Sequence, residues 1–221
     1  MSASRKNKHV HVIDHPLAQS ILTDLRNKDT TQIPFRKGLV KLGRLMSFEI
    51  ISSFPTKVVE VETPLKVKAK GVTVPDMEHV VIINVLRAAT ALVEGMLKSF
   101  PHARLGVLAV QRVEEKEGIE NVKPVKFFVK IPKFSGQDTV IIADPMLATG
   151  GTLLATIAEV YKIGKPKRLL LCTVISCDYG VDKVMKKYPN VELYTLAIDH
   201  ELNTHAYIVP GLGDAGDRSF G

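Results

Sequence analysis

The sequence predicts an α/β fold in which a doubly wound, mainly parallel sheet is flanked by helices. Short runs of β-branched, apolar residues alternate along the chain with segments of helical periodicity, which is the pattern of successive strand–helix units. The runs are apolar throughout, as expected for strands buried on both faces. With 221 residues, 45% of them hydrophobic, the chain can bury one full core, and no repeat or linker divides residues 1–221 into more than one domain.

The N-terminal quarter is predicted to hold a flexible arm and two helices. Residues 1–13 begin with a polar, basic stretch that lacks the apolar segment of a signal peptide, so we expect a short disordered arm. Apolar residues recur at helical spacing in Pro16–Arg26 and again from about Pro34 to Ile51. The second helix has a basic face, which is usually just a solvated surface; it carries Arg36, Lys37, Lys41 and Arg44.

Two alternating segments then predict a hairpin within residues 57–74. Lys57–Thr63 and Leu65–Lys70 alternate apolar and polar residues on either side of Pro64. Taken alone, the pattern indicates only a local hairpin.

The next strands are expected to enclose a long polar segment. Val80–Val85 is a buried strand followed by a helix to about Ser99, and Leu105–Val110 is the next strand. Residues 112–124 are too polar to pack, and Pro124–Ile131 alternates as a returning strand. A polar excursion of this length in a compact domain is often a lid, so we expect a flexible lid loop at 112–124.

The C-terminal half continues the alternation and ends in a glycine-rich segment. The expected elements, in order, are the strand Val140–Ala143, the helix Leu153–Ile163, the strand Arg168–Ser176, the helix Tyr179–Lys187 and the strand Val191–Ile198. Residues 199–221 follow, and Tyr207–Gly221 contains four glycines and leaves no room for another layer. We expect residues 199–221 to lie over the carboxyl ends of the strands as a hood.

The stretch after Val140–Ala143 has the features of an anion-binding loop. Asp144 stands where the strand ends, the usual place for site residues in an open α/β sheet. Pro145 has no N–H and is expected to end the pairing of the strand. Thr149-Gly150-Gly151-Thr152 then opens the next helix, so free N–H groups, the helix dipole and two hydroxyl groups can meet an anion. An ordinary strand–turn–helix link is the alternative.

Spacing excludes two other phosphate-binding motifs. No lysine follows Gly150 or Gly151, as a P-loop would require. A literal GxGxxG match spans Gly211–Gly216, but only five residues follow it, so we expect neither the helix nor the second strand of a dinucleotide site.

Composition and charge limit the partners and the compartment. The formal net charge of +7 favours an anionic partner, either a small phosphate compound or nucleic acid, unless it simply marks a solvated surface. The chain has no run of about 18 apolar residues, so we expect no membrane span. Cys172 and Cys177 lie in or near an apolar stretch and are expected to be buried thiols, which suits a reducing cytoplasm, although a disulfide stays open.

Two long strings make the sequence similar to a known family. Asp144-Pro-Met-Leu-Ala-Thr-Gly-Gly-Thr152 and Tyr207-Ile-Val-Pro-Gly-Leu-Gly-Asp-Ala-Gly-Asp-Arg218 resemble motifs of the uracil phosphoribosyltransferases, a branch of the type I phosphoribosyltransferases, with an archaeal character. The resemblance runs from about Asp14 to Gly221. Many type I enzymes carry two adjacent acids where this chain has Asp144-Pro145, so the resemblance leaves a metal-binding acid pair in doubt here.

The resemblance implies transfer of a ribose 5-phosphate unit from phosphoribosyl diphosphate (PRPP) to uracil N1, giving UMP and pyrophosphate. The implied PRPP-binding residues are Arg87, Arg112, Asp144, Pro145, Met146, Leu147, Ala148, Thr149, Gly150, Gly151, Thr152 and Asp214. The implied uracil-binding residues are Ile208, Gly213, Asp214 and Ala215, and the implied catalytic residues are Asp214, Arg112 and Asp144. Mg²⁺ would be carried by PRPP and lie near Asp214 without a direct protein ligand.

The resemblance also implies features outside these motifs. The lid would cover PRPP with Arg112 at its base, and the hairpin would reach a second subunit of a homodimer or homotetramer. The peptide bond between Leu86 and Arg87 would be cis. PRPP alone would account for the basic charge, so we expect no nucleic-acid partner. GTP would act as an activator at Lys37, Gly38, Leu39, Val40 and Lys41.

Several alternatives stay open at this point. A regulator that binds nucleotides and RNA without chemistry would share the phosphate loop and the charge, and a phosphoribosyltransferase for another base would share the motifs. Asp217 could compete with Asp214 for the carboxylate role, but its place beside Arg218 suggests a structural pair. His200 and His205 lie near the hood, where a structural role is favoured over a catalytic one.

Overall fold

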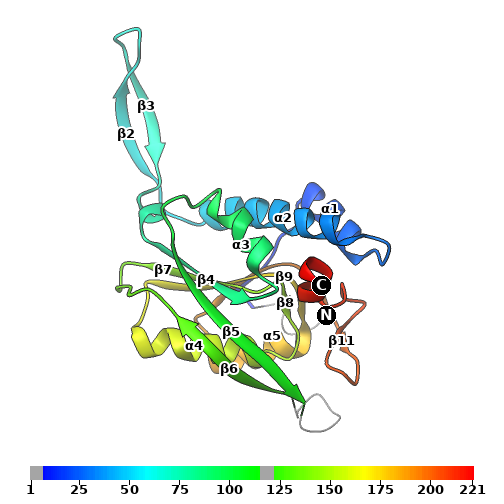
Figure 1. Ribbon diagram of the computed structural model, residues 1–221. Helices are drawn as coiled ribbons and strands as arrows, with labels where there is room; N and C mark the ends of the chain where they lie inside the picture. The colour runs from blue at the N-terminus through cyan, green and yellow to red at the C-terminus, as the bar shows by residue number, and fades with distance from the viewer. Residues whose placement is uncertain (1–6, 115–121) are drawn as a thin grey trace.

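The computed structural model describes residues 7–114 and 122–221, and describes side chains outside 111–127. A twisted sheet runs through the middle of the molecule, and a two-stranded hairpin projects away from it (Figure 1). In the described part of the chain, the sheet order is β1-β10-β9-β7-β4-β5-β6, with β8 paired to β9. The strands are β1 Val10–Val12, β4 Val80–Leu86, β5 Arg104–Glu114, β6 Val122–Lys130, β7 Thr139–Ala143, β8 Met146–Leu147, β9 Arg168–Cys177 and β10 Glu192–Asp199.

Helices cover both faces of this sheet, which confirms the predicted α/β class. Among the described strands of this sheet, every pair is parallel except β5–β6, which is antiparallel. Helices α1, α2 and α3 lie on one side, and α4 and α5 lie on the other (Figure 1). The helices are α1 Pro16–Arg26, α2 Gln32–Ser52, α3 Thr90–Leu97, α4 Gly151–Ile163, α5 Asp178–Lys187 and α6 Ala215–Phe220, with a 3₁₀ turn at Pro75–Glu78.

The helices and central strands lie within about two residues of their predicted bounds, because their apolar pattern follows their burial. Six of the seven residues of β4 are buried and the last, Leu86, is partly buried; all five residues of β7 are buried. Cys172 and Cys177 are buried free thiols, as expected, and burial raises the pKa of Cys172 to about 12. None of the described helices is long and apolar enough to cross a membrane.

The prediction of a flexible arm over residues 1–13 is wrong at its C-terminal end. Val10–Val12 form β1, which pairs in parallel with β10 at the edge of the sheet. The His11 ring stacks on Tyr194 with 4.5 Å between ring centroids, and Ile13 is 7% exposed. Three residues are too few to show a periodicity, so this strand forms through pairing with a distant partner. Residues 1–6 lie outside the described residues.

The predicted lid loop at 112–124 is also shorter than expected. Strand β5 continues to Glu114 and β6 starts at Val122, with Arg112 opposite Pro124 in the antiparallel register. Two antiparallel strands satisfy each other's main-chain groups, so polar residues can extend such a ribbon at the edge of a sheet. Residues 115–121, and with them the centre of the predicted lid, lie outside the described residues.

The predicted hairpin within 57–74 is present as β2 (Lys57–Glu62) and β3 (Lys68–Thr73). The second strand begins later than predicted, because the turn occupies the residues after Pro64. The hairpin extends from the body of the molecule (Figure 1), and its valines are largely exposed, with Val58 at 68% and Val72 at 65%.

Helices α2 and α3 cross in main-chain contact at two glycines. A Cβ atom on Gly43 would lie 2.0 Å from the carbonyl oxygen of Leu92, and one on Gly95 would lie 1.9 Å from that of Val40. Neither position has room for a methyl group, so the two helices approach more closely than side chains would permit.

The C-terminal segment contains more regular structure than predicted. Strands β11 (Glu201–Leu202) and β12 (Ile208–Val209) form a small antiparallel pair. The expectation of no helix after Gly211–Gly216 is wrong, because α6 begins at Ala215. Asp214 caps this helix: its Oδ1 accepts a hydrogen bond from the N–H of Asp217 at 2.9 Å.

Candidate active site

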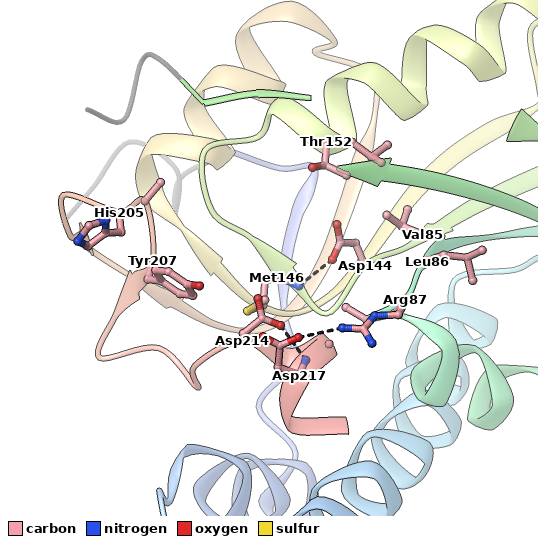
Figure 2. Close-up of a pocket in the computed structure, with 14 residues that line it drawn as sticks. Val85, Leu86, Arg87, Asp144, Met146, Thr152, His205, Tyr207, Asp214 and Asp217 are labelled. Carbon is pink, nitrogen blue, oxygen red and sulfur yellow. Dashed lines mark hydrogen bonds and ion pairs between the residues drawn. The ribbon is translucent and has the colours of Figure 1, made fainter. Parts of the chain in front are cut away.

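A pocket of about 470 Å³ opens between the carboxyl ends of the central strands and the hood, residues 199–221 (Figure 2). The lining comes from the ends of β4 and β7, from the loop before α4, and from the hood. The lining residues are Val85, Leu86, Arg87, Ala88, Val110, Asp144, Met146, Thr152, His205, Ala206, Tyr207, Asp214, Gly216 and Asp217. The predicted hood position is thereby confirmed, and three predicted clusters meet in one cavity.

The loop from Met146 to Leu153 encloses a second, smaller hollow. Gly150 has a φ of +79° and is the N-cap of α4, so the chain turns sharply there before the helix begins. The predicted residues Met146, Leu147, Ala148, Thr149, Gly150, Gly151 and Thr152 all line this hollow. The loop therefore presents a concave surface at the positive end of the dipole of α4, which suits a phosphate group.

Strand β7 ends at Ala143, just before Pro145, as predicted, but pairing with β9 resumes directly after the proline. Its carbonyl oxygen accepts from the N–H groups of Val174 and Ile175 at 3.0 and 3.1 Å, and β8 pairs with β9 immediately afterwards. The missing N–H is not needed, since the carbonyl makes the contact. Asp144, 5% exposed, accepts from the N–H of Met146 at 3.3 Å and lines the main pocket (Figure 2).

Helix α5 packs against this loop, residues 146–153 and called the phosphate loop from here on, at Gly180. A Cβ atom on Gly180 would lie 2.2 Å from the carbonyl oxygen of Ala148 and 3.0 Å from Cδ1 of Leu147. The main chain of α5 is thus in direct contact with the main chain of the loop, and the position of the loop depends on this glycine.

Arg87 lies at the opposite wall of the pocket and faces the hood (Figure 2). The peptide bond between Leu86 and Arg87 is cis, as the resemblance implies. The guanidinium Nη2 contacts Asp217 Oδ1 at 2.9 Å, and Nη1 donates to the carbonyl oxygen of Gly221 at 3.0 Å. The side chains of Arg87 and Asp217 are 58% and 68% exposed, so this ion pair is accessible to a competing anion.

The expected pair between Asp217 and Arg218 is wrong. Asp217 turns to Arg87 instead, because consecutive residues on a helix point in different directions. The guanidinium of Arg218 lies 4.2 Å from the ring centroid of Phe35. It donates to main-chain carbonyl oxygens of the hood, of the last turn of α1 and of the α1–α2 connection, namely those of Leu212, Leu25, Asn27 and Thr30.

The remaining predicted site residues are placed as follows. Asp214 lines the pocket, whereas Ile208, Gly213 and Ala215 belong to the hood but are not among the lining residues. Arg112 lies in β5, and its side chain is outside the described part of the chain. Lys37, Gly38 and Lys41 line a separate cavity of about 340 Å³ between α1 and α2; Leu39 is fully buried in the core.

Several lining or supporting residues were missed by the sequence reasoning. Val85, Ala88 and Val110 line the pocket without having been singled out, and so do Ala206 and Gly216 of the predicted hood; His205 also lines it, although only a structural role was favoured for it. His200 is 61% exposed and pairs with Asp178, in keeping with a structural role. Asn84 is buried on β4, and its Nδ2 lies 3.5 Å from Oγ1 of Thr90. The two side chains stand on either side of the arginine loop, the segment 87–89 that connects β4 to α3 and contains Arg87. A single amide inside an apolar strand is the signal that could have drawn attention to Asn84.

The pocket carries oxygen ligands of the kind that Mg²⁺ prefers. The carboxylates of Asp144, Asp214 and Asp217 all line it. Among the residues that the structure describes, however, no group of three or more histidine, cysteine or acidic side chains is placed to hold a metal ion by itself. Asp144 and Asp214 therefore offer carboxylates to a cation that would take its remaining ligands from a substrate, whereas Asp217 is paired with Arg87.

An anion loop at a helix N-terminus, an arginine loop facing it and a hood closing the gap, all on one mainly parallel sheet, define a type I phosphoribosyltransferase. The family model described as uracil phosphoribosyltransferase matches residues 12–221. The chain belongs to this family.

Relatives and a solved structure agree with this assignment over nearly the whole chain. The uracil phosphoribosyltransferase of Pyrobaculum arsenaticum is 53% identical over 211 residues, covering 96% of this chain and 98% of that protein. That of Metallosphaera sedula is 50% identical over 214 residues, covering 96% and 99%. The solved structure of the AQ2163 protein from Aquifex aeolicus superposes with a TM-score of 0.85 at 31% identity, covering 96% and 97%.

Proposed function

We propose that this protein transfers the 5-phosphoribosyl group of PRPP to N1 of uracil, releasing pyrophosphate and forming UMP, as a step of pyrimidine salvage. The observation that carries the proposal is that the phosphate loop, Arg87 and the hood residue Asp214 line two adjoining hollows at one end of the sheet. The names of the relatives give the base.

The ribose phosphate part of PRPP fits the loop before α4. The main-chain N–H groups of Ala148–Thr152 and the hydroxyl groups of Thr149 and Thr152 hold the 5-phosphate. The carboxylate of Asp144, at the end of β7, accepts hydrogen bonds from the ribose hydroxyl groups.

The leaving pyrophosphate becomes more negative as the C1–O bond breaks. Arg87 binds it with the planar fork of its guanidinium, after exchanging Asp217 for the ligand, and Arg112 of β5 adds a second positive charge. Mg²⁺ carried by PRPP would add charge neutralisation, with the carboxylate of Asp214 available to attract it. Asp214 itself stabilises the cationic ribose, so the reaction needs no protein nucleophile.

The hood is proposed to read the base through main-chain groups of Ile208, Gly213 and Ala215. Uracil offers O4 as an acceptor and N3–H as a donor, and cytosine inverts both. Each buried group left unpaired costs about 1–3 kcal/mol, so two mismatches give uracil at least about a hundredfold preference in kcat/KM.

The measurement is product chromatography of the purified protein with PRPP, Mg²⁺ and each free base in turn. UMP from uracil, and at most traces from cytosine, is the expected result, and Ala215→Ser should keep the preference because it leaves the main chain in place. A folded protein that forms no UMP would favour the non-catalytic nucleotide-binding or RNA-binding regulator. Product from another base alone would favour a different phosphoribosyltransferase.

GTP is expected to raise the rate at subsaturating PRPP by binding the cavity between α1 and α2. Lys37 and Lys41 line this cavity, next to Asp24 and Thr30, and offer positive charge to a triphosphate. Initial rates with and without GTP test this, with Lys37→Gln as the variant and Lys186→Gln, exposed on α5, as the control. Equal rates in wild-type protein would contradict it.

The hairpin β2–β3 is proposed to contact a second copy in a homodimer or homotetramer. Its exposed valines would be covered there, which suits an isolated two-stranded hairpin that is marginal on its own. A cytoplasmic location accords with the two free cysteines.

A further inference from the structure

Four hydrogen bonds link Gly211 of the hood, Arg26 at the end of α1 and Asp199 at the end of β10 with one another. Arg26, the last residue of α1, donates from Nη1 and Nη2 to the two carboxylate oxygens of Asp199, both at 2.8 Å. The same pair holds both main-chain polar groups of Gly211. Asp199 Oδ2 accepts from its N–H at 3.0 Å, and Arg26 Nη1 donates to its C=O at 2.8 Å.

Most of this cluster is shielded from water, although the Arg26 side chain is 24% exposed. Asp199 is 8% exposed and Gly211 is buried, so water competes little for these charge-assisted bonds. Gly211 has a φ of +63°, and a Cβ atom there would lie 2.0 Å from the carbonyl oxygen of Ile208. The turn is therefore tight, and its one central residue is held from both sides by charged groups.

This anchor lies close in sequence to the residues proposed to read the base. Gly211 precedes Gly213 by two residues and Asp214 by three, and the intervening Leu212 is buried, at 2% exposed. Neither Arg26 nor Asp199 is among the residues that line the pocket. Arg26 and Asp199 therefore act on the site through the position of the hood main chain, which they contact at Gly211.

We infer that Arg26 and Asp199 are positioning residues for base selection: they hold the hood main chain in the register that matches uracil, and so set the preference for uracil over cytosine. This inference rests on the proposed function. It assigns a role in specificity to two residues that never touch the substrate.

The decisive variant is Arg26→Lys, which keeps the charge and most of the stem but loses the planar fork. Because misplacing a binding group by about 1 Å can cost about a hundredfold, we expect KM for uracil to rise about tenfold and the uracil-to-cytosine ratio of kcat/KM to fall about tenfold. KM for PRPP should change by less than about twofold, since the phosphate loop is not involved. Asp199→Asn, which turns an amide N–H₂ toward the guanidinium, should move the same quantities further.

A matched control stands at the other end of the same strand. Arg168 pairs with Glu192, the first residue of β10, through Nε–Oε1 and Nη2–Oε2 contacts of 2.9 and 2.8 Å, and both side chains are 19% exposed. Arg168→Lys should lower Tm without moving KM for uracil.

The outcomes separate the two proposals. A selective rise in KM for uracil in Arg26→Lys, absent from Arg168→Lys, supports the positioning role. If both variants only lose stability and keep the base preference, the pair is structural and the inference is overturned. If wild-type protein forms no UMP in the same assay, the proposed function fails instead. Should Asp199→Asn not fold, Arg26→Lys alone decides.

Discussion

Asp214→Asn is expected to lower kcat by about 10²–10³-fold while the protein stays folded, as is typical when one preorganised electrostatic group is removed from an active site. The side chain lines the pocket and caps α6 through Oδ1. Asparagine is as good an N-cap as aspartate and has nearly the same volume, so the helix should persist. What the change removes is one negative charge near the cationic ribose and the proposed Mg²⁺.

The matched control is Asp217→Asn, the same change three residues along the same helix. Asp217 is 68% exposed and pairs with Arg87, so its loss should leave kcat within a few-fold of wild type while releasing the arginine for pyrophosphate. Steady-state kinetics of the two variants, with circular dichroism as a folding check, make the comparison. If Asp214→Asn turns over normally and Asp217→Asn does not, the carboxylate role belongs to Asp217.

Gly180→Ala is expected to reduce kcat/KM for PRPP by about a hundredfold, because a small displacement of a positioning loop has an effect of this size. The added methyl group would lie 2.2 Å from the carbonyl oxygen of Ala148, a main-chain atom that cannot move without moving the phosphate loop. The overlap should also cost about 1–3 kcal/mol of unfolding free energy.

Gly136→Ala is the control for this prediction, since a Cβ atom there meets only the carbonyl oxygen of Lys165, at 3.9 Å. Its KM for PRPP should match wild type. Initial rates over a range of PRPP concentrations at saturating uracil give kcat/KM and KM for PRPP, and thermal unfolding gives the loss of stability. An unchanged KM in Gly180→Ala would mean that the loop tolerates the shift and that its contact with α5 does not position the phosphate.

The parts of the site that follow local pattern were predictable from the sequence. The β-branched run before Asp144 marks a buried strand, and two glycines before a helical segment mark an anion loop, so both were placed within a residue or two. The resemblance extended this to Arg87, which lies outside the two long strings, and to Asp214 within the second; the structure brings both to the lining of one pocket.

What escaped prediction depends on partners far away in the chain. Arg26 and Asp199 are separated by 173 positions, and no local pattern links a helix-terminal arginine to the end of a strand. The edge strand at Val10–Val12 forms by pairing with β10, and the partner of Asp217 was misjudged because adjacency in sequence is not adjacency in space. Long-range pairing determines these features.

The crossing of α2 and α3 at Gly43 and Gly95 has a consequence for how this protein can change over evolutionary time. Helix α3 follows the arginine loop directly, and the glycine contacts fix it against α2 rather than against a deformable layer of side chains. Any residue larger than glycine at either position would push α3, and the arginine loop with it. In this packing, each of the two helix-interior positions therefore admits only glycine, which restricts how this chain can change there.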